Sequence, residues 1–281
     1  MSNATRRKQP LVLVSEDYNP DVWQMHDGES ESQSWLAVAQ DLWGRGCFGP
    51  GQLDAMRQGA GGLTLDKKKI VGAAGCSLGG LGQAAVEYGA YIDVFESDPE
   101  VLAYCQSNAG KLLKVAAWNP LVPNLKAERY HALIASRAFS LTEDVGFLAA
   151  HLSKGLKAGG NLFVDELYAA DASAGQLIGQ AIAGPGQKFY LHSQDEILQA
   201  FKGTHAELRS NASANESLMA VIRKGLTYGE ELARLLKAIP QPVGRQRLMA
   251  FANELQRAAV LYQGLEKGLV TAGRYIFSKS K

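Results

Sequence analysis

One segment in the first half of the chain constrains the fold more than any other feature. It runs from Lys69 along an apolar stretch into the glycine-rich turn 75–80, and a second apolar stretch then ends at Glu96. This order predicts a buried strand, a turn, a helix at about 81–88 and a second strand, the repeating unit of open parallel sheets. Glu96 follows Gly75 by 21 positions, close to the roughly 20 at which a carboxylate meets a nucleotide ribose. The segment therefore predicts a nucleoside-containing cofactor.

The same alternation of strands and helices continues through the middle of the chain. Asp98 and Pro99 begin a helix as its N-cap and first residue, and a further helix is expected from Thr142 to Ala158. We expect strands at about 69–74, 91–96, 114–118, 131–136 and 161–167. This rhythm predicts an α/β fold with a doubly wound, mostly parallel, seven-stranded sheet. The last strand, at about 271–278, is expected to run antiparallel at or next to an edge.

The chain after position 212 follows a different pattern. A long helical stretch, 216–268, is interrupted at 240–242 and carries two apolar stripes at helical spacing, which indicate the core faces of a helical pair. We expect this pair to form a lid over an acceptor pocket. The expected organisation is an N-terminal cap segment with helices, a cofactor-binding core, a helical lid and a closing strand, at 1–65, 66–212, 213–270 and 271–281.

Composition excludes several classes of partner. The 281 residues carry a net charge of +1, so no single-sign field is present to hold nucleic acid. No apolar run approaches the roughly 20 residues needed to span a membrane. Three cysteines without a paired spacing indicate reduced thiols and a cytoplasmic location, and the scattered histidines indicate no metal site.

Several passages together resemble one known family. They are 43–55, with its Trp-Gly and Pro-Gly-Gln-Leu-Asp steps; 71–80, the glycine-rich turn; Glu96; 133–137, Leu-Ile-Ala-Ser-Arg; 156–162, Leu-Lys-Ala-Gly-Gly-Asn-Leu; and the closing 275–277, Tyr-Ile-Phe. The chain, over about residues 38–281, resembles class I S-adenosylmethionine-dependent methyltransferases, and among them the phosphoethanolamine N-methyltransferase-like group. The resemblance implies a Rossmann-like fold, S-adenosylmethionine as cofactor and a small-molecule methyl acceptor.

The resemblance also assigns roles to individual residues. It implies a cofactor site formed by Gly75, Ser77, Gly79, Glu96, Trp118, Ser136 and Arg137. Candidates for holding an amine or taking a proton are Tyr18, Glu166 and Tyr168. Each assignment has an alternative: Glu96 could be a solvated strand-end acid, Trp118 a core residue, Arg137 a member of a surface ion pair, and the acids that end the fifth strand could cap a helix or loop.

This chain departs from the family at positions that handle cofactor and acceptor. Alanine stands at 73 and 138 where the family has acids, and Ser77 replaces a glycine. The family's Tyr–His pair has no counterpart, because no histidine lies at 141–142 and Tyr18 has the wrong spacing. We expect a methyltransferase for a small molecule such as an amine. The alternative is a non-catalytic descendant that serves as a binding or scaffold module.

Overall fold

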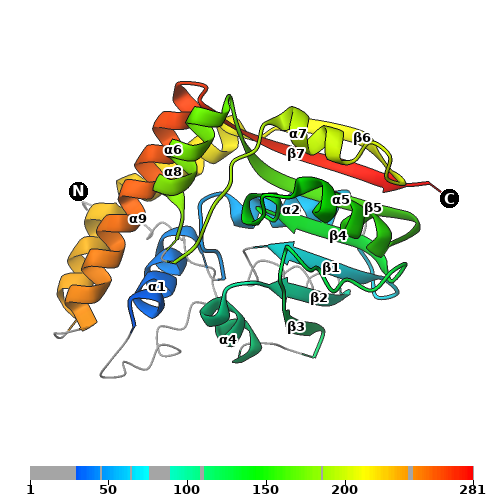
Figure 1. Ribbon diagram of the computed structural model, residues 1–281. Coiled ribbons are helices and arrows are strands. Elements are labelled where there is room, and N and C mark those ends of the chain that lie inside the picture. Colours follow the sequence, from blue (N-terminus) through cyan, green and yellow to red (C-terminus); the bar gives the residue numbers. More distant parts are fainter. Residues whose placement is uncertain are drawn as a thin grey trace, which may run out of the picture.

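The computed structural model describes residues 30–44, 46–63, 65–75, 89–107, 111–184, 186–239 and 243–280, with only the backbone at position 32. The expected helix at 81–88 lies outside the described residues, as do the candidate site residues Tyr18, Ser77 and Gly79. The elements below refer to the described part of the chain, and Figure 1 shows their arrangement.

Seven strands form one sheet in the order β3-β2-β1-β4-β5-β7-β6. Their bounds are Ile70–Gly75 for β1, Tyr91–Glu96 for β2, Leu113–Ala117 for β3, Tyr130–Ser136 for β4, Leu156–Ala169 for β5, Ala206–Ser213 for β6 and Val270–Lys279 for β7. The first five strands pair in parallel, while β7 runs antiparallel to both β5 and β6. The predicted seven-stranded, mostly parallel sheet is confirmed, with β7 next to the edge strand β6.

Helices cover both faces of the sheet, as the nearly continuous burial of β1 and β2 requires. One apolar core lies under α1, α2 and α4, which span Glu31–Trp43, Gln52–Gly62 and Pro99–Ser107. The opposite core lies under α5 and α7, which span Val145–Gly155 and Gln194–Ala200. The result is a three-layer arrangement whose parallel strands all end on one side (Figure 1).

Two long antiparallel helices gather with α1 and α6 at that end of the sheet (Figure 1). They are α8, Asn215–Lys237, and α9, Val243–Glu266, and they match the predicted helical pair. Gly225 of α8 lies against the Trp43 indole of α1, so closely that a Cβ would overlap the ring. The close approach of α8 to α1 therefore depends on this glycine.

The helix α6, Ala172–Ile182, is absent from the sequence expectations. Its glycines and alanines give a weak helical pattern, although Asp171 caps its first turn through the N–H of Ala174 at 2.8 Å. A Cβ at Gly175 would lie 2.7 Å from the carbonyl oxygen of Leu191, and one at Gly179 would lie 2.6 Å from that of Phe189. These glycines let the segment 189–191 pack directly on the helix, a contact that local sequence does not reveal.

The boundary between α5 and β5 corrects another expectation. The helix was expected to reach Ala158 and the strand to begin near 161, but α5 ends at Gly155 and β5 begins at Leu156. Leu156 is paired with Tyr130 of β4, so sheet pairing takes over from the helix three residues before the expected end. The helix also begins later than Thr142, because Asp144 caps it through the N–H of Phe147 at 2.8 Å.

Neither described cysteine is a reactive thiol. Cys47 and Cys105 are buried, and burial raises the pKa of the Cys47 thiol to about 12, far above the range of a nucleophilic thiolate. The described residues contain no group of His, Cys, Asp or Glu that could hold a metal ion. No described helix combines the length and apolar character needed to cross a membrane.

Candidate functional site

The ends of the central strands lie side by side at the sheet edge that faces α1, α6, α8 and α9. We call these four helices the cap. Gly75 at the end of β1 is paired with Ser136 at the end of β4, and Ser136 with Asp165 of β5. Glu96 ends β2 on the other side of β1. The carboxyl end of a parallel sheet, next to the strand order reversal, is where open α/β folds bind ligands. The sheet therefore brings Gly75, Glu96 and Ser136 together as predicted.

Gly75 turns the chain sharply at this edge. Its φ of 101° lies in the region that favours glycine, and a Cβ there would overlap the carbonyl oxygen of Ser136. Backbone from β1 and β4 thus meets with no side chain between the two strands. This cradle is a feature of sites where a ligand approaches the main chain.

One carboxylate oxygen of Glu96 accepts backbone hydrogen bonds, and the other has no hydrogen-bond partner among the described residues. Its Oε1 accepts hydrogen bonds from the backbone N–H groups of Ser97 at 2.8 Å and Asp98 at 2.9 Å. Its Oε2 is buried and has no partner among the described residues. Burial raises the pKa of this carboxyl group from 4.5 to about 8. The alternative of a solvated strand-end acid is wrong, because the residue is only 1% exposed.

Asp98, in contrast, has a local structural role. Its Oδ1 accepts from the N–H groups of Glu100 at 2.9 Å and Val101 at 3.0 Å, which caps the first turn of α4 as the sequence predicted. Its Oδ2 accepts from the side-chain amide of Gln187 at 3.2 Å. Asp98 therefore ties the segment after α6 to the end of β2.

Trp118 lies beside Glu96 in the backbone but packs away from it. The backbone N–H of Trp118 donates to the carbonyl oxygen of Glu96 at 2.8 Å. Its indole side chain belongs to the core on the α5 side of the sheet, together with Phe95. The burial favours the core alternative for this residue. Its indole Nε1 has no acceptor within the described chain, as is also true of the buried Ser136 hydroxyl.

Arg137 follows β4 in a left-handed backbone conformation, with φ of 55°, which costs roughly 1 kcal/mol or more and persists where surrounding contacts hold it. Its N–H donates to the carbonyl oxygen of Asp165 at 2.9 Å. Its Nε lies 3.5 Å from Asp165 Oδ2, an ion-pair distance without hydrogen-bond geometry. Asp165 Oδ1 accepts from Arg274 Nε at 3.0 Å. The alternative of a surface ion pair is wrong in one respect, because this ion pair is buried.

One guanidinium nitrogen of Arg137 remains available. Its Nη1 is buried without an acceptor in the described part of the molecule, and its side chain is 8% exposed. A buried guanidinium donor without an acceptor is costly, so this nitrogen marks a position where an acceptor group would be favoured.

The two strand-five candidates do not face open space. Glu166 accepts four hydrogen bonds, from the N–H groups of Phe139, Ser140 and Leu167 and from the Ser140 hydroxyl at 2.6 Å. It thereby fixes the turn η2, Phe139–Leu141, and burial raises its pKa. Tyr168 is buried edge-on against Tyr275, and burial raises its pKa well above 10. Both support the sheet rather than line a cavity.

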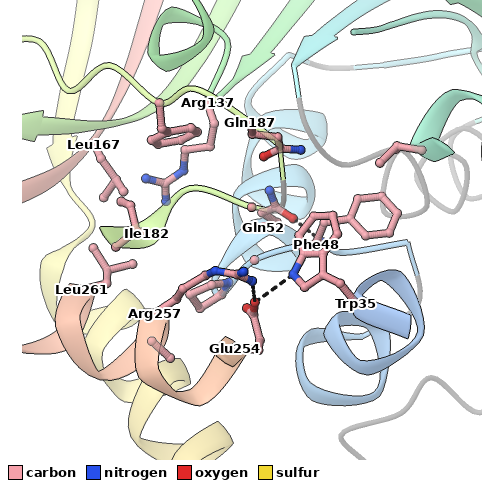
Figure 2. A pocket seen from close by; sticks show the side chains of 16 residues that line it. Trp35, Phe48, Gln52, Arg137, Leu167, Ile182, Gln187, Glu254, Arg257 and Leu261 are labelled. Carbon is pink, nitrogen blue, oxygen red and sulfur yellow. Dashed lines mark hydrogen bonds and ion pairs between the residues drawn. The ribbon is translucent and has the colours of Figure 1, made fainter. Parts of the chain in front are cut away.

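A cavity of about 80 Å³ lies between the sheet edge and the cap (Figure 2). It is lined by Trp35, Phe48, Gly49, Pro50, Gln52, Val101, Arg137, Leu167, Ile182, Gly184, Gln187, Phe189, Glu254, Arg257, Ala258 and Leu261. A water molecule needs roughly 10–15 Å³, so the cavity has room for several waters or a small organic group. Most of its wall is apolar or aromatic, with two guanidinium groups reaching into it (Figure 2).

A buried carboxylate organises the cap wall of the cavity. Glu254 of α9 accepts from the Trp35 indole at 2.9 Å, from the Trp43 indole at 2.7 Å and from Arg257 Nη1 at 3.0 Å. Arg257 also lies over the Trp35 ring, 6.0 Å from its centroid. Figure 2 shows Trp35, Glu254 and Arg257 joined in this way. The network binds α1 to α9 and holds the Arg257 guanidinium at the cavity.

No family model and no curated protein matches this sequence. Among solved structures, it is similar to phosphoethanolamine N-methyltransferase 2 of Haemonchus contortus, with a TM-score of 0.71 and 12% identity over 90% of this chain. It spans only 58% of that enzyme's chain. A putative sarcosine dimethylglycine methyltransferase from Galdieria sulphuraria gives 0.64 and 17%, over 82% of this chain and 84% of that one. The chain has the class I methyltransferase fold.

The same fold also occurs in a protein whose name describes a different reaction. The [4+2]-cyclase SpnF is similar to this chain with a TM-score of 0.67 and 12% identity, over 88% of this chain and 91% of the cyclase. A likeness at this identity establishes the fold, and the fold alone does not specify the reaction. The reaction has to be argued from the residues at the sheet edge and in the cavity.

Within this fold, sequence reasoning missed the cap residues of the cavity. The helix with Glu254 and Arg257 was expected to belong to a lid over an acceptor pocket, and that of Trp35 to supply a core face, but no binding or polar role was expected for these three side chains. One signal was present: Glu254 interrupts the apolar stripe of α9, between Phe251 and Leu255, and a charge at a core position is informative because it must find partners.

Proposed function

We propose that this protein is an S-adenosylmethionine-dependent methyltransferase acting on a small molecule. The observation that carries the proposal is the buried Glu96 carboxyl group with its free Oε2 at the end of β2. A nucleoside presents hydroxyl donors that would satisfy this oxygen, and the Gly75 cradle lies on the neighbouring strand. When bound, the cofactor supplies an electrophilic methyl group on a sulfonium.

The site divides into two parts on this proposal. Gly75, Glu96 and Ser136 hold the cofactor at the sheet edge, and the roles expected for Ser77, Gly79 and Trp118 remain predictions. The cavity beyond Arg137 holds the acceptor, closed by α1 and α9 as a lid, with α8 packed against both helices. Alignment of the acceptor with the methyl group and exclusion of water then account for the chemistry.

The residues that line the cavity provide no free general base. Its one carboxylate, Glu254, accepts three hydrogen bonds, and the lining contains neither tyrosine nor histidine among the described residues. His192 does lie near the turn where the family histidine was sought, with Nε2 2.8 Å from the Thr142 carbonyl oxygen. His192 lines an outer groove that adjoins the cavity at Gln187 and Phe189, and it is not part of the cavity lining. The acceptor atom should therefore carry an available lone pair before it enters.

A non-catalytic role remains the second candidate, because of Ala73. This residue, which replaces the family's acid, is packed in the apolar core at 1% exposure. It offers nothing to the methionine part of the cofactor. A scaffold of this kind would bind neither S-adenosylmethionine nor S-adenosylhomocysteine.

Calorimetric titration with both cofactor forms separates these two functions. At pH 8, where the Glu96 carboxyl group is about half ionised, binding of S-adenosylhomocysteine should weaken in Glu96→Ala by about 1.5–3 kcal/mol, the cost of losing a charge-assisted hydrogen bond. This result would support the methyltransferase. The absence of any binding at millimolar cofactor by folded protein supports the scaffold. Wild-type affinity in Glu96→Ala would reject the proposed cofactor site.

A further inference from the structure

Within the described part of the chain, the cavity contains one buried donor without a partner, on Arg137, and its one carboxylate is already occupied by donors. Arg137 Nη1 is buried without an acceptor in the described structure. Arg257 contacts Glu254 through Nη1, and its side chain is only 16% exposed. Both oxygens of Glu254 are used, one by Trp43 and the other by Trp35 and Arg257.

The amide side chains of the cavity wall do not change this balance. Gln52 Oε1 accepts from the N–H of Phe48 at 2.7 Å, and Gln187 donates to Asp98 at 3.2 Å. Buried donors are favourably matched by a ligand that brings acceptor atoms. Guanidinium groups recognise carboxylate and phosphate in particular, because their planar donors fit two oxygens at once.

The same wall gives a cation little to bind. One aromatic face of Trp35 already carries the Arg257 guanidinium, so a cationic amine would have to compete with it there. The Oε2 atom of Glu254 already accepts two hydrogen bonds, from the Trp35 indole and from Arg257. An ammonium group in this cavity would lie near two guanidinium groups without a carboxylate of its own.

The remaining wall specifies the rest of the ligand. The side chains of Phe48, Leu167, Ile182, Phe189 and Leu261 enclose the space between the two arginines. Apolar walls with a few fixed polar groups are typical of sites for compact organic molecules. A ligand that consisted of charged groups alone would leave these walls unmatched.

We infer that the acceptor pocket takes an organic anion: a carboxylate or phosphate attached to a compact apolar or aromatic body, with Arg137 and Arg257 as its anchors. This inference rests on the proposed function, since it names the acceptor class of that site. Both anchors are held in place before the ligand arrives, Arg137 by Asp165 and Arg257 by Glu254. Such preorganisation favours tight and selective binding.

The test uses probes that share a ring and differ in charge. Calorimetry of the full-length protein, with and without saturating S-adenosylhomocysteine, compares benzoate, neutral benzamide and cationic benzylamine. We expect benzoate to bind at least about tenfold more tightly than benzamide, and benzylamine to bind no better than benzamide. Phenyl phosphate distinguishes a phosphate from a carboxylate, and preference for either anion over benzamide supports the inference.

A matched pair of arginine variants ties the preference to the cavity. Arg257→Gln should remove most of the benzoate preference and leave benzamide affinity within about twofold. Arg223→Gln is the control, because Arg223 also stands on a helix with its guanidinium over an aromatic ring, Tyr262 at 5.8 Å, but outside the cavity lining. Arg257→Lys, which keeps the charge but loses the planar fork, should retain part of the preference.

Three results would overturn the inference: tighter binding of benzylamine than of benzoate, equal effects of Arg257→Gln and Arg223→Gln, or no binding of any probe at about 10 millimolar, where even a millimolar Kd gives nearly full occupancy. The proposed function is judged separately, by S-adenosylhomocysteine binding and its dependence on Glu96. Anion preference without cofactor binding would refute methyl transfer and leave the anion pocket. Cofactor binding without anion preference would refute the anion pocket and leave the proposed methyl transfer.

Discussion

Replacing Glu96 with glutamine should make the protein less able to bind cofactor and, above about pH 5, relatively more stable. The folded protein holds a proton on this carboxyl group up to about pH 8, whereas an ordinary glutamate loses it near 4.5. Between these values the folded state binds more protons than the unfolded chain, so stability falls as pH rises. Glutamine cannot lose a proton, and its stability curve lacks this decline.

The magnitude follows from the distance between the two pKa values. Each pH unit between them costs about 1.4 kcal/mol. Relative to Glu96→Gln, the wild type should therefore lose about 3 kcal/mol of unfolding free energy between pH 5 and pH 7. The constant cost of a buried amide without a partner cancels in this comparison, because it is the same at both pH values. Glutamine keeps an oxygen for the N–H groups of Ser97 and Asp98.

Urea unfolding at several pH values measures this difference, and calorimetry with S-adenosylhomocysteine measures the opposite effect on binding. The variant should bind about 30-fold more weakly at pH 8, the equivalent of about 2 kcal/mol for a charged hydrogen bond. Wild-type affinity should rise about 50-fold from pH 6 to pH 8, as the ionised fraction of a carboxyl group with a pKa of about 8 grows from about 1% to about half, while affinity of the variant stays constant.

Asp93→Asn provides the control on the same strand. Asp93 is also a buried acid, but it is paired with Arg129 Nε at 2.8 Å and the Tyr130 hydroxyl at 3.2 Å. Its loss should lower stability at neutral pH and leave cofactor affinity unchanged. Parallel stability curves for wild type and Glu96→Gln would refute the buried proton, and equal affinities would refute the ribose role.

Three further predictions concern the cap, the cradle and the acceptor. Glu254→Gln should lower the unfolding free energy by about 3 kcal/mol, since it weakens a buried ion pair and two indole hydrogen bonds, whereas the exposed Glu231→Gln should change it by less than about 0.5 kcal/mol; equal denaturant midpoints would contradict this. Gly75→Ala should abolish cofactor binding and destabilise by more than about 2 kcal/mol, compared with about 1 kcal/mol for Gly203→Ala, which shares a positive φ but faces open space. Turnover of phosphoethanolamine, followed by mass spectrometry, should be about 10²–10⁴-fold below ordinary enzyme rates, because the cavity lacks a free general base; normal turnover would overturn that reasoning.

The sheet could be predicted from the sequence because its signals are local. The apolar runs that form β1, β2 and β4 are short and bounded by turns, and the spacing from Gly75 to Glu96 sets the carboxylate at the end of the second strand. The helix α6 could not be predicted in this way. Its two interior glycines weaken the helical pattern and make sense only against the carbonyl groups of Phe189 and Leu191.

The cavity could not be predicted for a related reason: its contacts join distant parts of the chain. Trp35 and Glu254 are 219 positions apart, and their hydrogen bond depends on how α9 packs against α1. The sequence placed Arg137 at the site, but its partner Asp165 is set by the register of β4 with β5. The role of Arg137 in cofactor binding, which the resemblance implied, stays a prediction and differs from the acceptor role that we infer from the cavity; its surroundings required the tertiary structure.

The cost of the unmatched polar atoms bears on whether the sheet edge still serves a ligand. Glu96 Oε2, Ser136 Oγ and Arg137 Nη1 are all buried without partners among the described residues, and each such group costs about 1–3 kcal/mol. These three atoms lie on neighbouring strand ends, whereas the unmatched atoms of Asp93, Ser153 and Tyr168 lie elsewhere in the fold. A protein that used this fold only as a scaffold would gain stability from an apolar residue at each position. A bound nucleoside and an anionic acceptor would instead supply the missing partners, which is why the pH and probe experiments above test one physical premise from two directions.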